Sequence, residues 1–244
     1  MAKFGKWIGA GLGAFAGGPI GAIIGFTVGS MIDGSSEAIK TATRTGYSGQ
    51  TTTGGYVMSL LVLTAAVMKA DGKVLKSELD YVKKFMVHNF GEASATEAVR
   101  MLRDLLMQTI PVNEVCNQIR KNMNYSARLQ LLHFLFGIAQ ADGEVETKER
   151  EIIGLISRGM GLTEKDFESI QAMFVPNTEA DYKILEIEPR VTDDEVKKAY
   201  RRMAMKYHPD KVSTLGDDFE NAAKEKFQSV NRAYENIKKE RKIA

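Results

Sequence analysis

The tripeptide His208, Pro209 and Asp210 places an imidazole, a rigid backbone unit and a carboxylate between two segments of helical spacing. Proline disfavours helical conformation in the residue before it, so we expect the preceding helix to end at or just before His208. The tripeptide is then held at an exposed tip, next to the negative end of a helix. Neither a nucleophile–base pair nor a phosphate loop accompanies it. This composition is not that of an active site, so we expect no enzymatic activity and no cofactor.

Two helices must position this tip, and Thr192 with Glu195 has the spacing of a capping box that opens the first of them. That helix has an apolar face made of Val196, Ala199 or Tyr200, Met203 and Tyr207. Its remaining surface is basic and carries Lys197, Lys198, Arg201, Arg202 and Lys206. The second helix has apolar residues at steps of three and four, namely Ala223, Phe227, Val230, Tyr234 and Ile237. With a shorter leading helix around Tyr182, the pattern predicts an antiparallel helical hairpin.

Residues 179–244 resemble the J-domain of DnaJ-type co-chaperones in the tripeptide, the tyrosine before it, the basic helix and the downstream aromatic positions. The resemblance implies docking on a DnaK-type ATP-dependent chaperone and stimulation of its ATP hydrolysis. Carried over position by position, the trigger is His208, Pro209 and Asp210. The docking face would consist of Tyr200, Lys197, Arg201, Arg202 and Lys206. Val212 and the acidic pair Asp217 and Asp218 depart from the common pattern, which bears on partner preference and not on the class.

A helical block from Tyr56 to about Val175 precedes the hairpin and contains a duplication. Residues 70–78 (ADGKVLKSE) match residues 141–149 (ADGEVETKE), and an apolar helix precedes each copy while an amphipathic helix follows it. We expect the glycine of each copy to adopt the left-handed conformation and the valine to pack on the core. The glutamate of each copy should lie in the first turn of the next helix, where its charge suits the dipole. Thr163 with Asp166 predicts another helix start.

This block, residues 56–175, resembles the TerB-like helical domain, a family named for tellurite resistance. The resemblance implies a metal-binding role for the acidic residues of the two turns, Asp71, Glu78, Asp142 and Glu149. The alternative is that these four only cap helices and interact with helix dipoles. We favour that alternative, because an oxygen-ligand cage usually needs more closely spaced donors. His88 and His133 are isolated in the sequence, and we expect packing or surface roles for them.

The segment from Trp7 to Ile32 has no charged side chain, and it is long enough to cross a bilayer core of about 30 Å as one helix. Glycines recur at every fourth position, at Gly5, Gly9, Gly13, Gly17, Gly21, Gly25 and Gly29. In water, each glycine inside a helix destabilises it by about 1 kcal/mol relative to alanine. In lipid, a glycine stripe lets two helices approach closely. Residues 1–32 therefore predict a glycine-zipper transmembrane segment and a homodimer that packs through it.

Other readings of the amino-terminal part are a shallow hairpin of two half-helices, suggested by Pro19, and a soluble or cleaved segment. Residues 33–55 are rich in serine, threonine, glycine and charge, which is typical of a flexible linker. Lysine and arginine counts on the two sides of the span barely decide its orientation. We expect the carboxyl side to face the cytoplasm, because ATP and DnaK-type chaperones are found there.

The whole chain is predicted to be all-α, with a net charge of +2 that does not call for nucleic acid as a partner. Its single cysteine, Cys116, excludes a disulfide framework within one chain. A membrane helix, a TerB-like domain and a carboxyl-terminal J-domain in this order resemble the DjlA-like membrane-anchored DnaJ proteins of bacteria. The resemblance implies a single-pass protein of the inner membrane that recruits a DnaK-type chaperone. The rival function is metal-ion binding or a tellurite-stress response through the TerB-like block.

Overall fold

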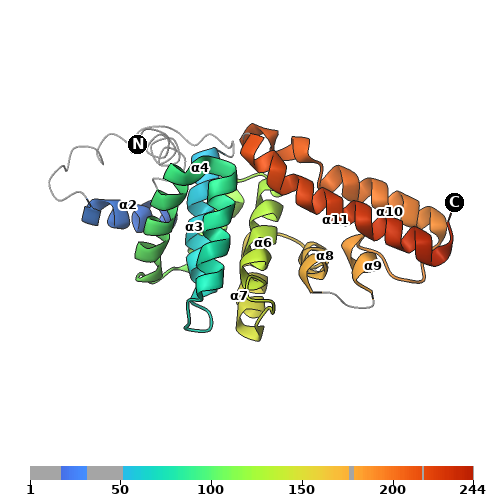
Figure 1. Cartoon of the computed structure of the whole chain (residues 1–244), viewed down its shortest axis with the longest axis horizontal. Coiled ribbons are helices and arrows are strands. Elements are labelled where there is room, and N and C mark those ends of the chain that lie inside the picture. The colour runs from blue at the N-terminus through green and yellow to red at the C-terminus, as the bar shows by residue number, and fades with distance from the viewer. Residues whose placement is uncertain (1–17, 32–51, 176–178, 216, 244) are drawn as a thin grey trace.

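The structure is a computed structural model, and it describes residues 18–31, 52–175, 179–215 and 217–243. Within these ranges the chain is helical and forms no strand, which confirms the all-α class. The helices are α2 (Pro19–Met31), α3 (Thr53–Met68), α4 (Lys76–Leu106), α5 (Val112–Asn122), α6 (Tyr125–Ala139), α7 (Thr147–Gly159), α8 (Glu164–Phe174), α9 (Ala180–Ile184), α10 (Asp193–Lys206) and α11 (Asp217–Arg241), with the short 3₁₀ helix η2 (Pro209–Leu215) between the last two. Figure 1 shows helices α3–α7 at one end of the molecule, the hairpin of α10 and α11 at the other, and α8 between them.

Helix α3 is apolar on all sides, and it is buried along its length because α4, α5, α6 and α7 surround it. Helix α3 begins at Thr53, within the segment that was predicted to be a linker as far as Gly55. The Thr52 hydroxyl accepts a hydrogen bond from the Gly55 amide at 3.2 Å, so residues 53–55 are already helical. Gly54 and Gly55 are buried there, where side chains would have to find room in the core.

The two copies of the duplicated motif connect α3 to α4 and α6 to α7. Gly72 and Gly143 have φ angles of +83° and +108°, which confirms the predicted left-handed glycines. Each motif ends in a glutamate that caps the following helix, as expected. The prediction for the valines is correct only in the second copy, where Val145 packs on the core. Val74 is 42% exposed, because the first turn stands away from the helices it joins.

Helix α2 begins at Pro19, a residue well suited to a first helical position because that position needs no amide donor. Ile20, Ile23 and Ile24 are buried, and α2 contacts α3, α4 and α5. The Ile20 amide donates a hydrogen bond to Gln118 Oε1 at 3.0 Å. Of the predicted transmembrane segment, residues 1–17 lie outside the described residues, and with them Gly5, Gly9, Gly13 and Gly17. No helix in the described ranges has the length and apolar character needed to cross a membrane.

The carboxyl-terminal hairpin consists of α9, α10 and α11, with α9 packed across α11 as the sequence predicted. Tyr182 and Leu185 are buried at this base. Arg241 closes it, since its guanidinium donates to the carbonyls of Val191 and Pro189 at 2.6 and 2.5 Å. The buried apolar residues of the hairpin are continuous with those of α3–α8, so one core runs through both parts.

Candidate chaperone-binding site

The helix that presents the tripeptide is fixed at both ends by local interactions. The Glu195 carboxylate accepts a hydrogen bond from the Thr192 amide at 2.8 Å, and the Thr192 hydroxyl accepts one from the Glu195 amide at 3.4 Å. Helix α10 ends at Lys206, where the Tyr207 amide still bonds to the Met203 carbonyl at 2.9 Å. Both the capping box and the end of the helix before His208 confirm the predictions from the sequence.

The tripeptide forms a tight, exposed corner between α10 and η2. His208 Nδ1 accepts a hydrogen bond from the Asp210 amide at 3.3 Å and lies 3.5 Å from Oδ2 of the Asp210 carboxylate. The side chains of His208 and Asp210 are 48% and 82% exposed. Phe227 of α11 meets the imidazole edge-on, with ring centroids 5.8 Å apart and planes at 79°. The corner therefore offers one imidazole N–H and one carboxylate to a partner.

The predicted docking residues on α10 are held in different ways. Arg201 is exposed, whereas Lys197 and Tyr200 are half-buried. Tyr200 stacks on Tyr234 with centroids 4.2 Å apart and donates a hydrogen bond to Asn231 Oδ1 at 3.1 Å, which ties α10 to α11. Arg202 is exposed and donates to the Leu185 carbonyl at 3.2 Å. The structure thus brings Arg201, His208 and Asp210 to the surface, while Tyr200 also supports the hairpin.

Three family models match this chain in consecutive ranges. They describe the co-chaperone DjlA transmembrane domain at residues 1–48, the tellurite resistance protein TerB at residues 58–172 and the DnaJ domain at residues 181–244. The chain belongs to the DjlA-like co-chaperones. It is a membrane-anchored bacterial J-domain protein, in which α9–α11 form the J-domain and α3–α8 the TerB-like domain.

The relatives of this DjlA-like protein cover most of its length. It is 27% identical over 229 residues to the co-chaperone protein DjlA of Vibrio vulnificus, which corresponds to 76% of this chain and 78% of the relative. The DjlA of Coxiella burnetii is 26% identical over 200 residues, 72% and 74% of the two chains. The chaperone protein DnaJ of Acetobacter pasteurianus is 51% identical over 63 residues, 26% of this chain and 15% of that protein. No solved structure matches the chain.

Lys206 of this DjlA-like protein points away from the open surface, toward the TerB-like domain. Its Nζ lies 2.5 Å from Oδ1 of Asp166 at the start of α8, and it also contacts the carboxylate of Glu186. Asp166 is fully buried, and its other oxygen accepts hydrogen bonds from the amide and hydroxyl of Thr163 at 2.7 and 2.5 Å. Burial raises the pKa of Asp166, but the bonds from Lys206, Thr163 and Tyr125 outweigh it and hold that pKa below its ordinary value.

Lys226 is a second residue at this junction, and the sequence interpretation missed it. Its side chain is fully buried, and Nζ donates to the Leu129 carbonyl of α6 at 3.0 Å. The amine also lies 5.7 Å from the centre of the Tyr207 ring. Burial lowers the pKa of the Lys226 amine well below its ordinary value. The sequence did contain a signal for the burial of Lys226, namely its spacing of three or four residues from the apolar positions of α11. The buried residues of that helix are Ala223, Lys226, Val230, Ala233 and Ile237.

The four acidic residues of the repeated turns each cap local backbone amides. Asp71 and Asp142 accept from the amides of Lys73 and Glu144 at 2.9 and 3.3 Å. Glu78 and Glu149 accept from the amides of Leu75 and Glu146 at 2.7 and 2.9 Å. Burial, reinforced by the neighbouring carboxylates, raises the pKa of Glu78 to about 7 and that of Glu149 to about 6. Among the described residues, no three histidine, cysteine or acidic side chains are grouped so that they could hold a metal ion.

Proposed function

We propose that His208, Pro209 and Asp210 are the residues through which this J-domain triggers ATP hydrolysis by its DnaK-type partner. The observation that carries the proposal is the exposed corner after α10, where the Asp210 amide binds Nδ1 of His208 and the side chains of both residues are open to solvent. A corner built this way can present the imidazole and the carboxylate together, because the Asp210 amide holds the His208 ring and Oδ2 of Asp210 lies 3.5 Å from Nδ1 of that ring. The protein acts on the partner's catalytic site and contributes no catalysis of its own.

In this proposal the basic face of α10 is the surface that docks on the partner. Arg201 and Arg202 are its exposed predicted members, with Lys197, Tyr200 and Lys206 along the same helix. Exposed positive charges steer a negatively charged partner surface and raise the association rate more than they raise affinity. Tyr200 is expected to act both as a contact and as a residue that holds α10 against α11 in the antiparallel hairpin.

The membrane arrangement belongs to the same proposal. A single span within residues 1–32 would hold the TerB-like domain and the J-domain on the cytoplasmic side, where the ATP-loaded partner is found. Self-association through Gly9, Gly13, Gly17, Gly21, Gly25 and Gly29 would make the anchored protein a homodimer. Protease treatment of intact spheroplasts should leave the J-domain uncut, and cleavage from outside would exclude this orientation.

The residue-level proposal is tested with His208→Gln in the full chain, reconstituted in lipid nanodiscs with a DnaK-type chaperone. We expect the variant to lose stimulation of ATP hydrolysis in single-turnover measurements while its circular dichroism stays that of the wild type. His88→Gln is the matched control, because His88 is an exposed histidine on α4 far along the chain from the tip. Full stimulation by the His208 variant would contradict the proposal.

The rival function, metal-ion binding through Asp71, Glu78, Asp142 and Glu149, has a test of its own. We infer that these carboxylates serve the local backbone. Asp71 and Asp142 accept amide hydrogen bonds within the two turns, and Glu78 and Glu149 accept theirs at the starts of α4 and α7. Calorimetry with divalent cations should then detect no site tighter than about 10⁻⁵ M, the weak end of sensor sites. A tighter stoichiometric site that is lost in Asp71→Ala with Asp142→Ala would favour the rival.

A further inference from the structure

We propose that the TerB-like domain carries a binding surface for the J-domain of the same chain, centred on Asp166, and that this surface competes with the DnaK-type chaperone for Lys206. The inference rests on the proposed function, because it takes Lys206 as part of the docking face. It adds a second partner for that lysine within the molecule. The unbound protein is then a closed form in which one docking residue is already occupied.

The ion pair itself is well protected from water. Asp166 is fully buried and the Lys206 side chain is 21% exposed, with Nζ 2.5 Å from Oδ1. A pair in such a position is much less screened by salt than a pair on the surface. Breaking it leaves a buried carboxylate without its cation, which is strongly unfavourable unless water enters. The contact between α8 and α10 therefore resists opening.

Asp166 is oriented by its own domain before the J-domain arrives. Thr163 and Tyr125 both donate hydrogen bonds to Oδ2, which leaves Oδ1 directed to Lys206. Because the carboxylate is already fixed, binding of Lys206 requires little further ordering. Sequence alone assigns Asp166 to the capping of α8, and the structure shows that the same side chain has a second role between domains.

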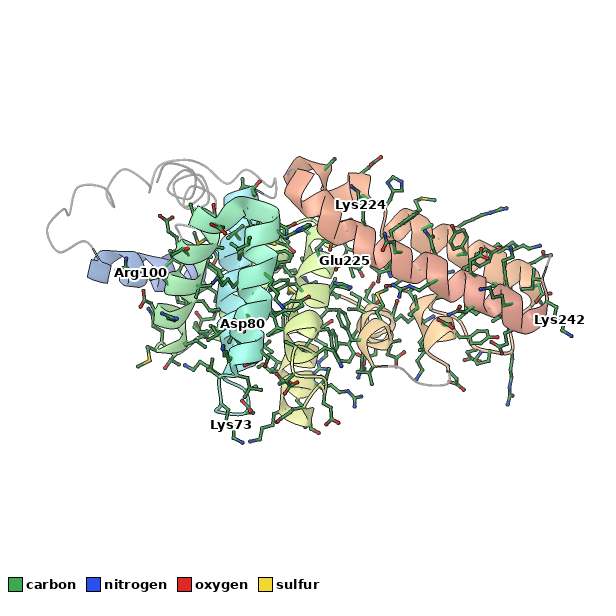
Figure 2. The ribbon with its side chains drawn as sticks, in the orientation of Figure 1. Lys73, Asp80, Arg100, Lys224, Glu225 and Lys242 are labelled. Carbon is green, nitrogen blue, oxygen red and sulfur yellow. The ribbon has the colours of Figure 1, made fainter. Side chains whose placement is uncertain are left out.

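Lys226 opposes the closed form at the same junction. In Figure 2 the neighbouring Lys224 and Glu225 mark the stretch of α11 that lies close to α6, far from Lys242 at the other end of the helix. The buried Lys226 amine has the Leu129 carbonyl and the Tyr207 ring as its contacts. A charged amine loses its hydration on entering such a site, and a single carbonyl does not replace it. Closure is thus favoured by Asp166 and disfavoured by Lys226, which makes it reversible.

The closed form leaves part of the J-domain accessible. Arg201, His208 and Asp210 remain exposed, so the chaperone can approach the tip while Lys206 is held. Full engagement of α10 would require Lys206 to leave Asp166. Changes on the TerB-like domain, none of which touch the tripeptide, should therefore alter the concentration of J-domain protein needed for stimulation.

Two variants of the full chain in nanodiscs test this in opposite directions. Asp166→Asn removes the charge by which the TerB-like domain holds Lys206 and leaves the contact with Glu186 inside the J-domain. We expect the half-maximal concentration for ATPase stimulation to fall by about fivefold, within the usual range of coupling between two sites. Glu164→Gln is the matched control, because it removes one exposed charge from the same turn of α8 without contacting Lys206. Lys226→Met removes the buried amine and should tighten closure, which raises the half-maximal concentration.

His208→Gln, measured in the same series, distinguishes failure of the competing surface from failure of the proposed function. If it abolishes stimulation while Asp166→Asn and Lys226→Met both behave as wild type, the competing surface is excluded and the proposed function stands. If His208→Gln stimulates normally, the proposed function itself fails. If Asp166→Asn does not fold, an unchanged half-maximal concentration for Lys226→Met is sufficient to overturn the inference.

Discussion

The rings of His208 and Phe227 meet edge to face across the gap between the tripeptide corner and α11, with centroids 5.8 Å apart. This contact is the only ring interaction that the described part of the chain gives to His208. We therefore expect Phe227 to act as a positioning residue, because its ring packs against the imidazole edge-on.

Phe227→Leu should lower the maximal stimulation of the DnaK-type ATPase and leave the half-maximal concentration unchanged. Leucine keeps most of the apolar contact but loses the edge-to-face interaction between the rings, which contributes about 0.5–1.5 kcal/mol in an aromatic pair. Single-turnover hydrolysis over a range of co-chaperone concentrations separates the two parameters. Phe227→Tyr keeps the ring and should restore the maximum; equal loss in both variants would argue against a role for the ring geometry.

Arg201→Glu should weaken association with the chaperone, and the difference from wild type should shrink as salt is added. Arg201 is exposed, and exposed charges are screened over about 10 Å at 0.1 M ionic strength. Association rates measured by surface plasmon resonance at several salt concentrations provide the test. Arg100→Glu makes the same charge change on α4, at the residue marked in Figure 2, and should have little effect.

Stability of the TerB-like domain should fall as pH rises from about 4.5 to about 7. The pKa of Glu78 rises from 4.5 in the unfolded chain to about 7 in the folded one, so the folded state binds more protons across this window. Glu149 adds a smaller effect that ends at about 6. Urea unfolding midpoints at pH values inside and above the window measure the slope.

Glu78→Gln keeps an acceptor for the Leu75 amide and removes the titration, so its unfolding midpoint should depend less on pH. Glu97→Gln, at an exposed position of α4, is the control and should keep the wild-type slope. A Glu78 variant with an unaltered slope would show that another group is responsible.

Gly25→Leu should weaken self-association of the span without disturbing the folded domains. A Cβ added at Gly25 meets no atom within 4 Å in this structure, so a substitution there starts in open space. Close approach of two glycine stripes does not leave that room. A membrane-association reporter should lose signal for Gly25→Leu and keep most of it for Gly25→Ala, and an undiminished leucine variant would remove the stripe from the dimer.

Local sequence rules predicted the parts of the site that depend on neighbouring residues. The capping box at Thr192, the end of α10 before His208 and the glycines of the repeated turns all follow from backbone requirements within a few positions. The same holds for the all-α class, which follows from apolar spacing along each helix. The end of the predicted linker was wrong because a single hydroxyl, that of Thr52, extends α3 by one turn.

The contacts between domains could not be predicted in this way. Asp166 and Lys206 lie on separate helices, and nothing in the periodicity of either helix specifies their relative orientation. The sequence position of Asp166 was already explained by its role in capping α8. Lys226 did carry a signal, since a lysine three residues after Ala223 and four before Val230 lies on the buried face of α11.

The burial of Lys226 has a consequence for experiments on fragments. A J-domain expressed alone lacks Leu129 and the rest of α6, so the Lys226 amine that is enclosed in the whole chain becomes solvated in the fragment. The excised domain therefore exposes an additional amine, that of Lys226, next to Phe227 and the tripeptide corner. We therefore expect affinities for a DnaK-type chaperone measured on such a fragment to differ from those of the anchored protein.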